Sequence, residues 1–272
     1  MSAATATTAP APPRPRAGAR AVPSRIVAPV AVGVIAIGVW QFLVSVVGVS
    51  DYLLPSPAAI GAELVRFLPA IVSGSAVTGG NALLGLLAGS LIGILLAAVA
   101  AAARPVNHML APIVAALAVI PIVALAPVLN TMFGADSQFG RQAIAGIAAF
   151  TPVFLGTLRG LRQATPVHRD LMRVYAASPW QAFRTVTLPT AVPHVFTGVR
   201  IASSLAVISA LVAEYFGGPR GGLGGLISTY AAQSAYARSW AFVVGAVVLG
   251  LVFFFAASRI ERLAARGVGP HR

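Results

Sequence analysis

Residues 165–189 read TPVHRDLMRVYAASPWQAFRTVTLP and form the centre of a polar, basic segment that extends from Arg159 to Pro193, between long apolar stretches. We call this segment the polar island. Thr165 is a good N-cap and Pro166 suits the first position of a helix, so the pattern predicts a short amphipathic helix that runs to about Ala177. The polar island is the part of the chain that a cytoplasmic partner would bind.

A second short helix is predicted after a tight corner in the polar island. Ser178 and Gln181 have the spacing of a capping box, with Pro179 at the first helical position. Leu188 and Pro189 are expected to end this helix before the next apolar stretch begins, because proline removes a helix hydrogen bond and its ring clashes with the carbonyl four residues earlier.

Two interpretations of the polar island are open. In one, it lies on the lipid headgroups and its arginines meet anionic lipid. In the other, the polar island binds in a groove on a protein partner. The corner and the apolar residues Tyr175 and Trp180 favour the protein partner, since a helix lying on lipid gains nothing from a defined cap and stop.

The rest of the chain has the composition of a membrane protein. Its 272 residues are 58% hydrophobic and 9% charged, with a mean hydropathy of +0.87, whereas about 25% of residues are charged in soluble domains. Charge-free windows supply the roughly 17 to 25 residues that a spanning helix needs. We predict an all-α polytopic membrane protein with six transmembrane helices at 27–49, 79–102, 110–133, 141–159, 194–216 and 239–258.

The residue types exclude several kinds of chemistry. Every basic residue among the 19 is arginine, and the chain contains no lysine and no cysteine. A phosphate-binding loop of the Walker type requires a lysine, so the chain itself cannot supply that ATPase site. Thiol and Schiff-base catalysis are excluded for the same reason, and the histidines lack the spacing of a metal site. We expect a non-catalytic chain with no cofactor of its own.

The arginines predict the orientation, because loops on the cytoplasmic side carry an excess of basic residues. With the N-terminus inside, the outer segments hold only Arg66, Arg141, Arg220 and Arg238. The inner segments hold fourteen: Arg14, Arg16, Arg20, Arg25, Arg104, Arg159, Arg162, Arg169, Arg173, Arg184, Arg259, Arg262, Arg266 and Arg272. Both termini are therefore expected in the cytoplasm. This distribution also accounts for the net charge of +13, so we expect no nucleic-acid partner.

The chain is expected to have a single membrane domain between two tails. Residues 1–25 are rich in Ala, Pro, Thr and Arg and cannot form a core, which predicts a disordered cytoplasmic tail. Residues 26–265 form the transmembrane domain, and 266–272 form a second cytoplasmic tail.

The segment from Asp170 to Pro193, DLMRVYAASPWQAFRTVTLPTAVP, resembles the EAA loop of permease subunits of bacterial ABC importers. Leu188-Pro189 matches the end of that motif. Two positions depart from it: Asp170-Leu171-Met172 replaces Glu-Ala-Ala, and Ala176 replaces a glycine. If the corner requires a left-handed backbone, the alanine costs roughly 1 kcal/mol or more.

Further motifs extend the resemblance over about residues 27–265, with the sulfonate, taurine, nitrate and bicarbonate group as the nearest match. They are YLLPSP at 52–57, IPIVALAP at 120–127, FG at 133–134, TGVRIA at 197–202, VAE at 212–214 and GLGGLI at 222–227.

The resemblance implies a permease subunit of an ATP-driven importer in the bacterial inner membrane, which forms the path for a small anionic solute. It implies a homodimer of permeases, separate ATP-binding subunits that hold ATP and Mg²⁺, and an extracytoplasmic solute-binding protein. The residues that it assigns to ATPase coupling are Asp170, Leu171, Met172, Arg173, Tyr175, Ala176, Ala177, Ser178, Pro179, Trp180, Leu188 and Pro189.

Three residues inside the predicted spans are candidates for the translocation path. Glu214 is one, because an ionisable group in a span is a functional candidate; alternatively it is an interfacial carboxylate, solvated or paired with Arg220. Pro121 and Pro127 are kinks or, alternatively, a gate hinge. Glycines at 85, 89 and 93 have the close-packing spacing of membrane helices, within one subunit or at a dimer seam.

Two other functions are compatible with a basic loop between spans. An ion-gradient-driven secondary transporter would normally show an inverted repeat and paired carboxylates near mid-bilayer, and the sequence shows neither. A structural membrane module that recruits a cytoplasmic partner would explain the polar island but not the motifs in the spans.

Overall fold

The computed structural model describes residues 22–50, 52, 54–134, 137–217 and 221–266, which fall into two compact units, Met1–Val49 and Ser50–Arg272. The first unit contains α1 (Val22–Val46), a helix of 25 residues that begins five residues before the predicted span. Residues 1–21 of the expected N-terminal tail lie outside the described residues, as do residues 267–272 of the C-terminal tail.

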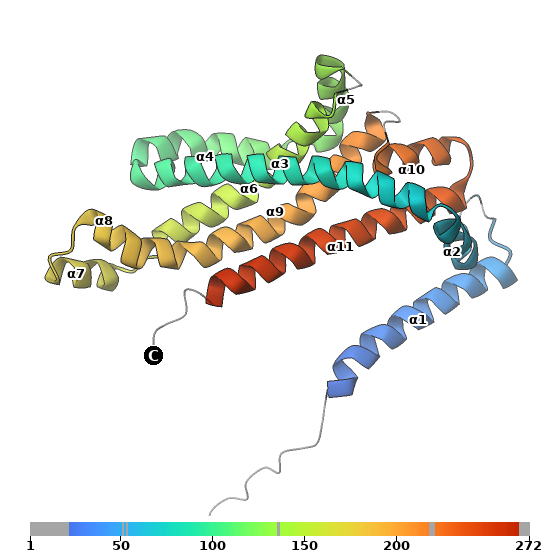
Figure 1. Cartoon of the computed structure of the whole chain (residues 1–272), viewed down its shortest axis with the longest axis horizontal. Helices are drawn as coiled ribbons and strands as arrows, with labels where there is room; N and C mark the ends of the chain where they lie inside the picture. The colour runs from blue at the N-terminus through green and yellow to red at the C-terminus, as the bar shows by residue number, and fades with distance from the viewer. Residues whose placement is uncertain (1–21, 51, 53, 135–136, 218–220, 267–272) are drawn as a thin grey trace, which may run out of the picture. The chain divides into compact units, whose positions relative to one another are not determined.

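The second unit is built from helices throughout its described part (Figure 1). They are α2 (Pro57–Arg66), α3 (Leu68–Ala102), α4 (Arg104–Val119), α5 (Ile122–Phe133), α6 (Phe139–Arg162), α7 (Pro166–Val174), α8 (Pro179–Ala182), a π-helical turn η1 (Phe183–Thr187), α9 (Leu188–Phe216), α10 (Leu223–Ala232) and α11 (Tyr236–Arg266). Two of them, α2 and α10, are too short to span a membrane and were not predicted.

Within the described residues, five helical segments are long and apolar enough to cross a membrane: Val27–Val46, Leu68–Ala102, Phe139–Arg162, Pro179–Phe216 and Tyr236–Arg266. The pair α4 and α5 passes the same test as one broken span, which makes six. The prediction of an all-α polytopic membrane protein with six spans agrees with this fold.

The third span predicted at 110–133 is broken, and the kink expected at Pro121 is present as a sharp bend. The chain bends by 95° between α4 and α5, at Ile120 and Pro121. Proline disfavours the helical region for the residue before it, and Ile120 accordingly has a ψ of 124°. Pro121 therefore breaks the helix, whereas Pro127 lies inside α5 without ending it.

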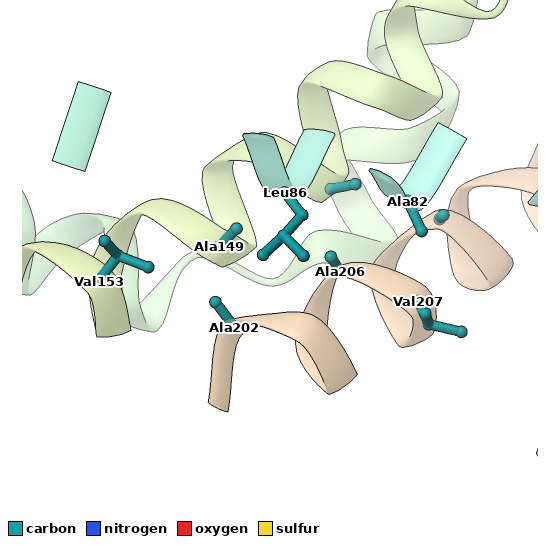
Figure 2. Packing of buried hydrophobic residues seen from close by; sticks show 9 residues of the cluster. Ala82, Leu86, Ala149, Val153, Ala202, Ala206 and Val207 are labelled. Atoms are coloured by element: carbon teal, nitrogen blue, oxygen red, sulfur yellow. The ribbon is translucent and has the colours of Figure 1, made fainter. Parts of the chain in front are cut away.

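The core of the second unit lies where α6 packs between α3 and α9. The side chains there are mostly alanine and valine, with Leu86 from α3 among them (Figure 2). Small side chains let helix backbones approach closely, and this close van der Waals packing is what holds membrane helices together. The cluster comprises Ala82, Leu86, Ala145, Ala149, Val153, Ala202, Ala206, Val207 and Ala210.

The glycines of α3 form part of this same packing. A Cβ atom at Gly85 would lie 2.6 Å from the carbonyl oxygen of Gln142 on α6, and one at Gly93 would lie 3.1 Å from that of Phe150. A Cβ at Gly89 would overlap the backbone of Gly146. The three glycines thus serve packing within one subunit.

Candidate functional site

The first helix of the polar island begins as predicted and ends earlier. The Thr165 hydroxyl accepts a hydrogen bond from the His168 N–H at 3.4 Å, with Pro166 at the first helical position. α7 then ends at Val174, three residues before the expected end. The capping signal therefore located the start of the helix, and the corner determines its end.

The corner that follows has the hydrogen-bond pattern of a Schellman motif. The Ala177 N–H donates to the Met172 carbonyl at 3.0 Å, and the Ala176 N–H donates to the Arg173 carbonyl at 2.9 Å. Ala176 has a φ of +49°, the left-handed conformation that usually requires glycine at this position. The corner therefore does require a left-handed backbone at the position where alanine replaces the glycine of the motif, and the alanine stores roughly 1–2 kcal/mol of backbone strain.

The second helix begins with the predicted capping box. The Ser178 hydroxyl accepts from the Gln181 N–H at 3.3 Å, and the Gln181 side-chain oxygen accepts from the Ser178 N–H at 2.7 Å. Two caps therefore flank the strained residue Ala176, and they fix the direction in which each helix leaves the corner.

The predicted stop at Leu188 and Pro189 is wrong, because the helix continues through them into the fifth span. Phe183–Thr187 forms a π-helical turn, in which the Leu188 N–H donates to the Phe183 carbonyl. Pro189 has no N–H to donate, and the wider turn shifts the hydrogen bonding by one residue ahead of it. The last part of the polar island and the fifth span thus form one continuous helical segment, Pro179–Phe216.

The polar island presents apolar side chains at its surface. Tyr175 is 72% exposed and Trp180 is 67% exposed, with the Trp180 ring stacked on Phe183 at 5.7 Å between centroids. Asp170 and Arg173 form an exposed ion pair at 3.2 Å. Of the other residues assigned to coupling, Leu171, Ala176, Ser178, Pro179 and Leu188 are exposed, and Met172, Ala177 and Pro189 are half-buried.

Glu214 lies near the end of the bundle opposite to the polar island. The alternative that its carboxylate is solvated at the membrane interface is wrong. Glu214 is 2% exposed. One carboxylate oxygen accepts from the Thr78 hydroxyl at 2.7 Å and from the Gly224 N–H at 3.2 Å, and the other accepts from the Asn81 amide at 3.2 Å. Arg220, its proposed partner, lies outside the described residues.

A buried arginine extends this hydrogen-bond network. Arg141 is 1% exposed in the first turn of α6, and its Nη1 donates to the Gln138 side-chain oxygen at 2.8 Å. The same oxygen accepts from the Asn81 amide at 2.9 Å. Among the described residues, the Nε and Nη2 groups of Arg141 have no hydrogen-bond partner. Such buried donors are uncommon in proteins and call for an explanation.

Sequence reasoning missed this network and two further ion pairs. Arg238 donates to Glu63 at 2.6 Å, 175 positions away in the chain. Arg200 pairs with Glu261 at 3.2 Å, so that α9 and α11 are joined near the end that carries the polar island. No local pattern signals pairs so distant in sequence.

A cavity of about 670 Å³ lies between α3, α4 and α6, and its lining is apolar except for Gln142. Pro121, Pro127 and Glu214 do not line it. Both prolines are exposed, whereas Glu214 is buried. In the part of the chain that the structure describes, no group of His, Asp or Glu side chains is placed to hold a metal ion.

Comparison with known proteins gives a family match across most of the helical bundle. A family model described as a binding-protein-dependent transport system inner membrane component matches residues 89–268. The matched range includes the polar island, Glu214 and Arg141.

The relatives are permeases of bacterial transport systems. The riboflavin transport system permease protein RibX of Chloroflexus aurantiacus is 31% identical over 234 residues, which cover 84% of this chain and 85% of the relative. A putative aliphatic sulfonates transport permease protein, SsuC of Bacillus subtilis, is 27% identical and covers 68% of this chain and 67% of the relative.

A similar fold occurs in a solved structure. A chain of an amino acid ABC transporter, crystallised with histidines, superposes with a TM-score of 0.61 at 16% identity. The superposition covers 73% of this chain and 95% of that chain.

Proposed function

We propose that a separate ATPase binds this chain at the corner around Ala176, because the chain belongs to the family of binding-protein-dependent transport system inner membrane components. The chain is a permease subunit of an ABC importer. Its transport step therefore needs an energy source on another subunit, and the polar island offers the surface that such a subunit would bind.

The rigid connection between the corner and the fifth span carries this proposal. Tyr175 and Trp180 are exposed beside a corner whose two helix ends are both capped. α8, η1 and α9 then run as one rod into the centre of the bundle. A displacement of the corner would consequently move α9 as a whole, and not merely a flexible loop. ATP-driven closure of the ATPase pair would therefore switch the bundle between inward-open and outward-open states.

We place the polar island in the cytoplasm and both termini on the same side of a bacterial inner membrane. α7 and α8 lie at one end of the bundle, and α2 and α10 lie at the other (Figure 1). The arginines near the first end outnumber those near the second, which is the asymmetry of the positive-inside rule. They are Arg104, Arg159, Arg162, Arg173, Arg184, Arg259, Arg262 and Arg266 against Arg66, Arg141 and Arg238.

This orientation has a direct test. A reporter that is active only in the cytoplasm, fused after Arg272, is expected to be active in intact cells. A reporter that is active only in the periplasm, fused at the same point, is expected to be silent. The reverse pattern would show that the topology is inverted and that the polar island faces outward.

The partners follow from the same proposal. A homodimer of permeases would sit on two ATP-binding subunits that hold ATP and Mg²⁺, and an extracytoplasmic binding protein would deliver the solute. We propose a small anion of the sulfonate, taurine, nitrate or bicarbonate type, which the sulfonate-named relative supports. The riboflavin-named relative indicates that one permease fold serves several solutes, so specificity would reside largely in the binding protein.

The division of roles predicts that the permease hydrolyses no ATP by itself. The chain has no lysine for a phosphate-binding loop. Permease purified without its partner should show ATPase activity at background level, and addition of the ATP-binding subunit should restore hydrolysis. A rate above background that follows the permease through successive purification steps would refute this assignment.

A further inference from the structure

The short helix α10 is held at its N-terminus by side chains from other helices. Its N-cap, Gly222, has no side chain to cap the first turn. The Leu223 N–H instead donates to the Thr78 hydroxyl at 2.9 Å, and the Gly224 N–H donates to the Glu214 carboxylate at 3.2 Å. Thr78 on α3 and Glu214 on α9 therefore satisfy two of the four N–H groups that a helix start leaves unpaired.

Two glycines allow this contact. A Cβ atom at Gly222 would overlap the carboxylate of Glu214, and one at Gly224 would overlap the carbonyl of Leu211. The backbone at the start of α10 is thus in direct contact with the Glu214 carboxylate, with no room for a side chain between them. Because a hydrogen bond is directional, the attachment is lost over a small displacement.

The hydrogen-bond network of Glu214 leads to donors on Arg141 that Glu214 does not contact. Asn81 donates both to Glu214 and to Gln138, and Arg141 donates to the same Gln138 oxygen. Only two amide side chains therefore separate the carboxylate from a guanidinium whose Nε and Nη2 have no partner among the described residues. A planar guanidinium is suited to bind a carboxylate through two N–H groups at once.

We propose that Thr78 and Glu214 form a latch that holds α10 against α3, and that α10 leaves α3 when the extracytoplasmic end opens, with the Glu214 carboxylate then passing to Arg141. A buried carboxylate left without a partner is strongly unfavourable. The unpaired donors of Arg141 make a second arrangement accessible, and the bundle can switch between the two. The latch rests on the proposed function, since opening of this end matters only in a transporter.

Cross-linking α10 to α3 tests the proposal directly. The chain contains no cysteine, so an introduced pair supplies the only thiols of the permease. A Cβ at Gly74 would lie 3.1 Å from a terminal carbon of Leu226, so the two positions are in contact across α3 and α10, and Gly74→Cys with Leu226→Cys is the pair to introduce. In proteoliposomes with the ATPase and the binding protein, we expect oxidation to lower uptake at least tenfold and reductant to restore it.

The two single-cysteine variants, treated with the same oxidant, should keep their uptake. If the fully cross-linked protein transports as fast as the same protein after treatment with reductant, the latch is overturned. This result is distinct from failure of the proposed function, for which the wild-type complex itself would show no ATP-dependent uptake.

Two point variants test the exchange of partners without a disulfide. Thr78→Val removes the hydroxyl that joins both α10 and Glu214 to α3. The latch then opens more readily, and the ATPase activity of the reconstituted complex, measured without binding protein, should rise at least threefold. Arg141→Lys keeps the charge but cannot offer two coplanar N–H groups, so the same activity should fall at least threefold. A purely structural role would change both rates in the same direction, and that outcome would contradict the proposal.

Discussion

Replacing Ala176 with tryptophan is expected to leave the permease in the membrane at normal abundance but unable to retain its ATPase or to transport. The substitution lies outside every span, so insertion should be unaffected. Ala176 already has a φ of +49°, and a bulky side chain there would obstruct the partner or distort the turn, at a cost of a few kcal/mol. Co-purification of the ATPase with the tagged permease measures the effect.

Two variants serve as controls for this experiment. Ala176→Gly relieves the left-handed strain, roughly 1 kcal/mol, and should retain the ATPase at least as well as the wild type. Ser234→Trp places the same bulk at another exposed residue with positive φ, +58°, after α10 at the other end of the bundle, and should also retain it. If Ala176→Trp co-purifies with the ATPase and transports at the wild-type rate, the polar island is a loop that lies on lipid.

Gly89→Ala is expected to destabilise the bundle more than its single added methyl group suggests. A Cβ at Gly89 would overlap the backbone of Gly146, so α3 and α6 would have to separate. Overpacking of this kind costs about 1–3 kcal/mol, and here a backbone atom, which cannot change rotamer, causes the clash. The thermal unfolding midpoint of the purified permease in detergent should fall clearly below that of the wild type.

Gly80→Ala is the matched control, because it is the same substitution on the same helix. A Cβ at Gly80 would meet no atom within 4 Å. Without a clash, alanine should stabilise the helix by up to about 1 kcal/mol through its higher helix propensity. Gly89→Ala has the same gain, so the difference between the two variants measures the clash. Equal midpoints for the Gly80→Ala and Gly89→Ala variants would show that the contact between α3 and α6 is looser than described.

The parts of the fold that depend on local sequence could be predicted, and the parts that depend on distant contacts could not. The spans follow from runs of uncharged residues, and the caps at Thr165 and Ser178 follow from patterns of four residues. α10 has only ten residues, too few for a hydropathy window to indicate a span. The continuation of the helix through Pro189 depends on a π-helical turn, and local rules for proline gave the opposite expectation.

The same distinction applies to the candidate site. The strain at Ala176 was anticipated because one residue departs from a local motif. By contrast, the Glu214 network joins residues up to 145 positions apart, and neither Thr78 nor Asn81 carries a local signal of function. Arg141 illustrates the limit well: its sequence position placed it in an outer segment at the start of a span, yet its side chain is 1% exposed.

The central claim, that this permease is driven by a separate ATPase through the polar island, has one decisive measurement. Permease, ATP-binding subunit and solute-binding protein are reconstituted into proteoliposomes, and uptake of labelled solute is followed with and without ATP in the absence of any ion gradient. We predict uptake that requires ATP and the ATP-binding subunit and that is lost in the Ala176→Trp variant. Uptake by the permease alone, driven by a proton or sodium gradient and indifferent to ATP, would contradict the claim and identify a secondary transporter.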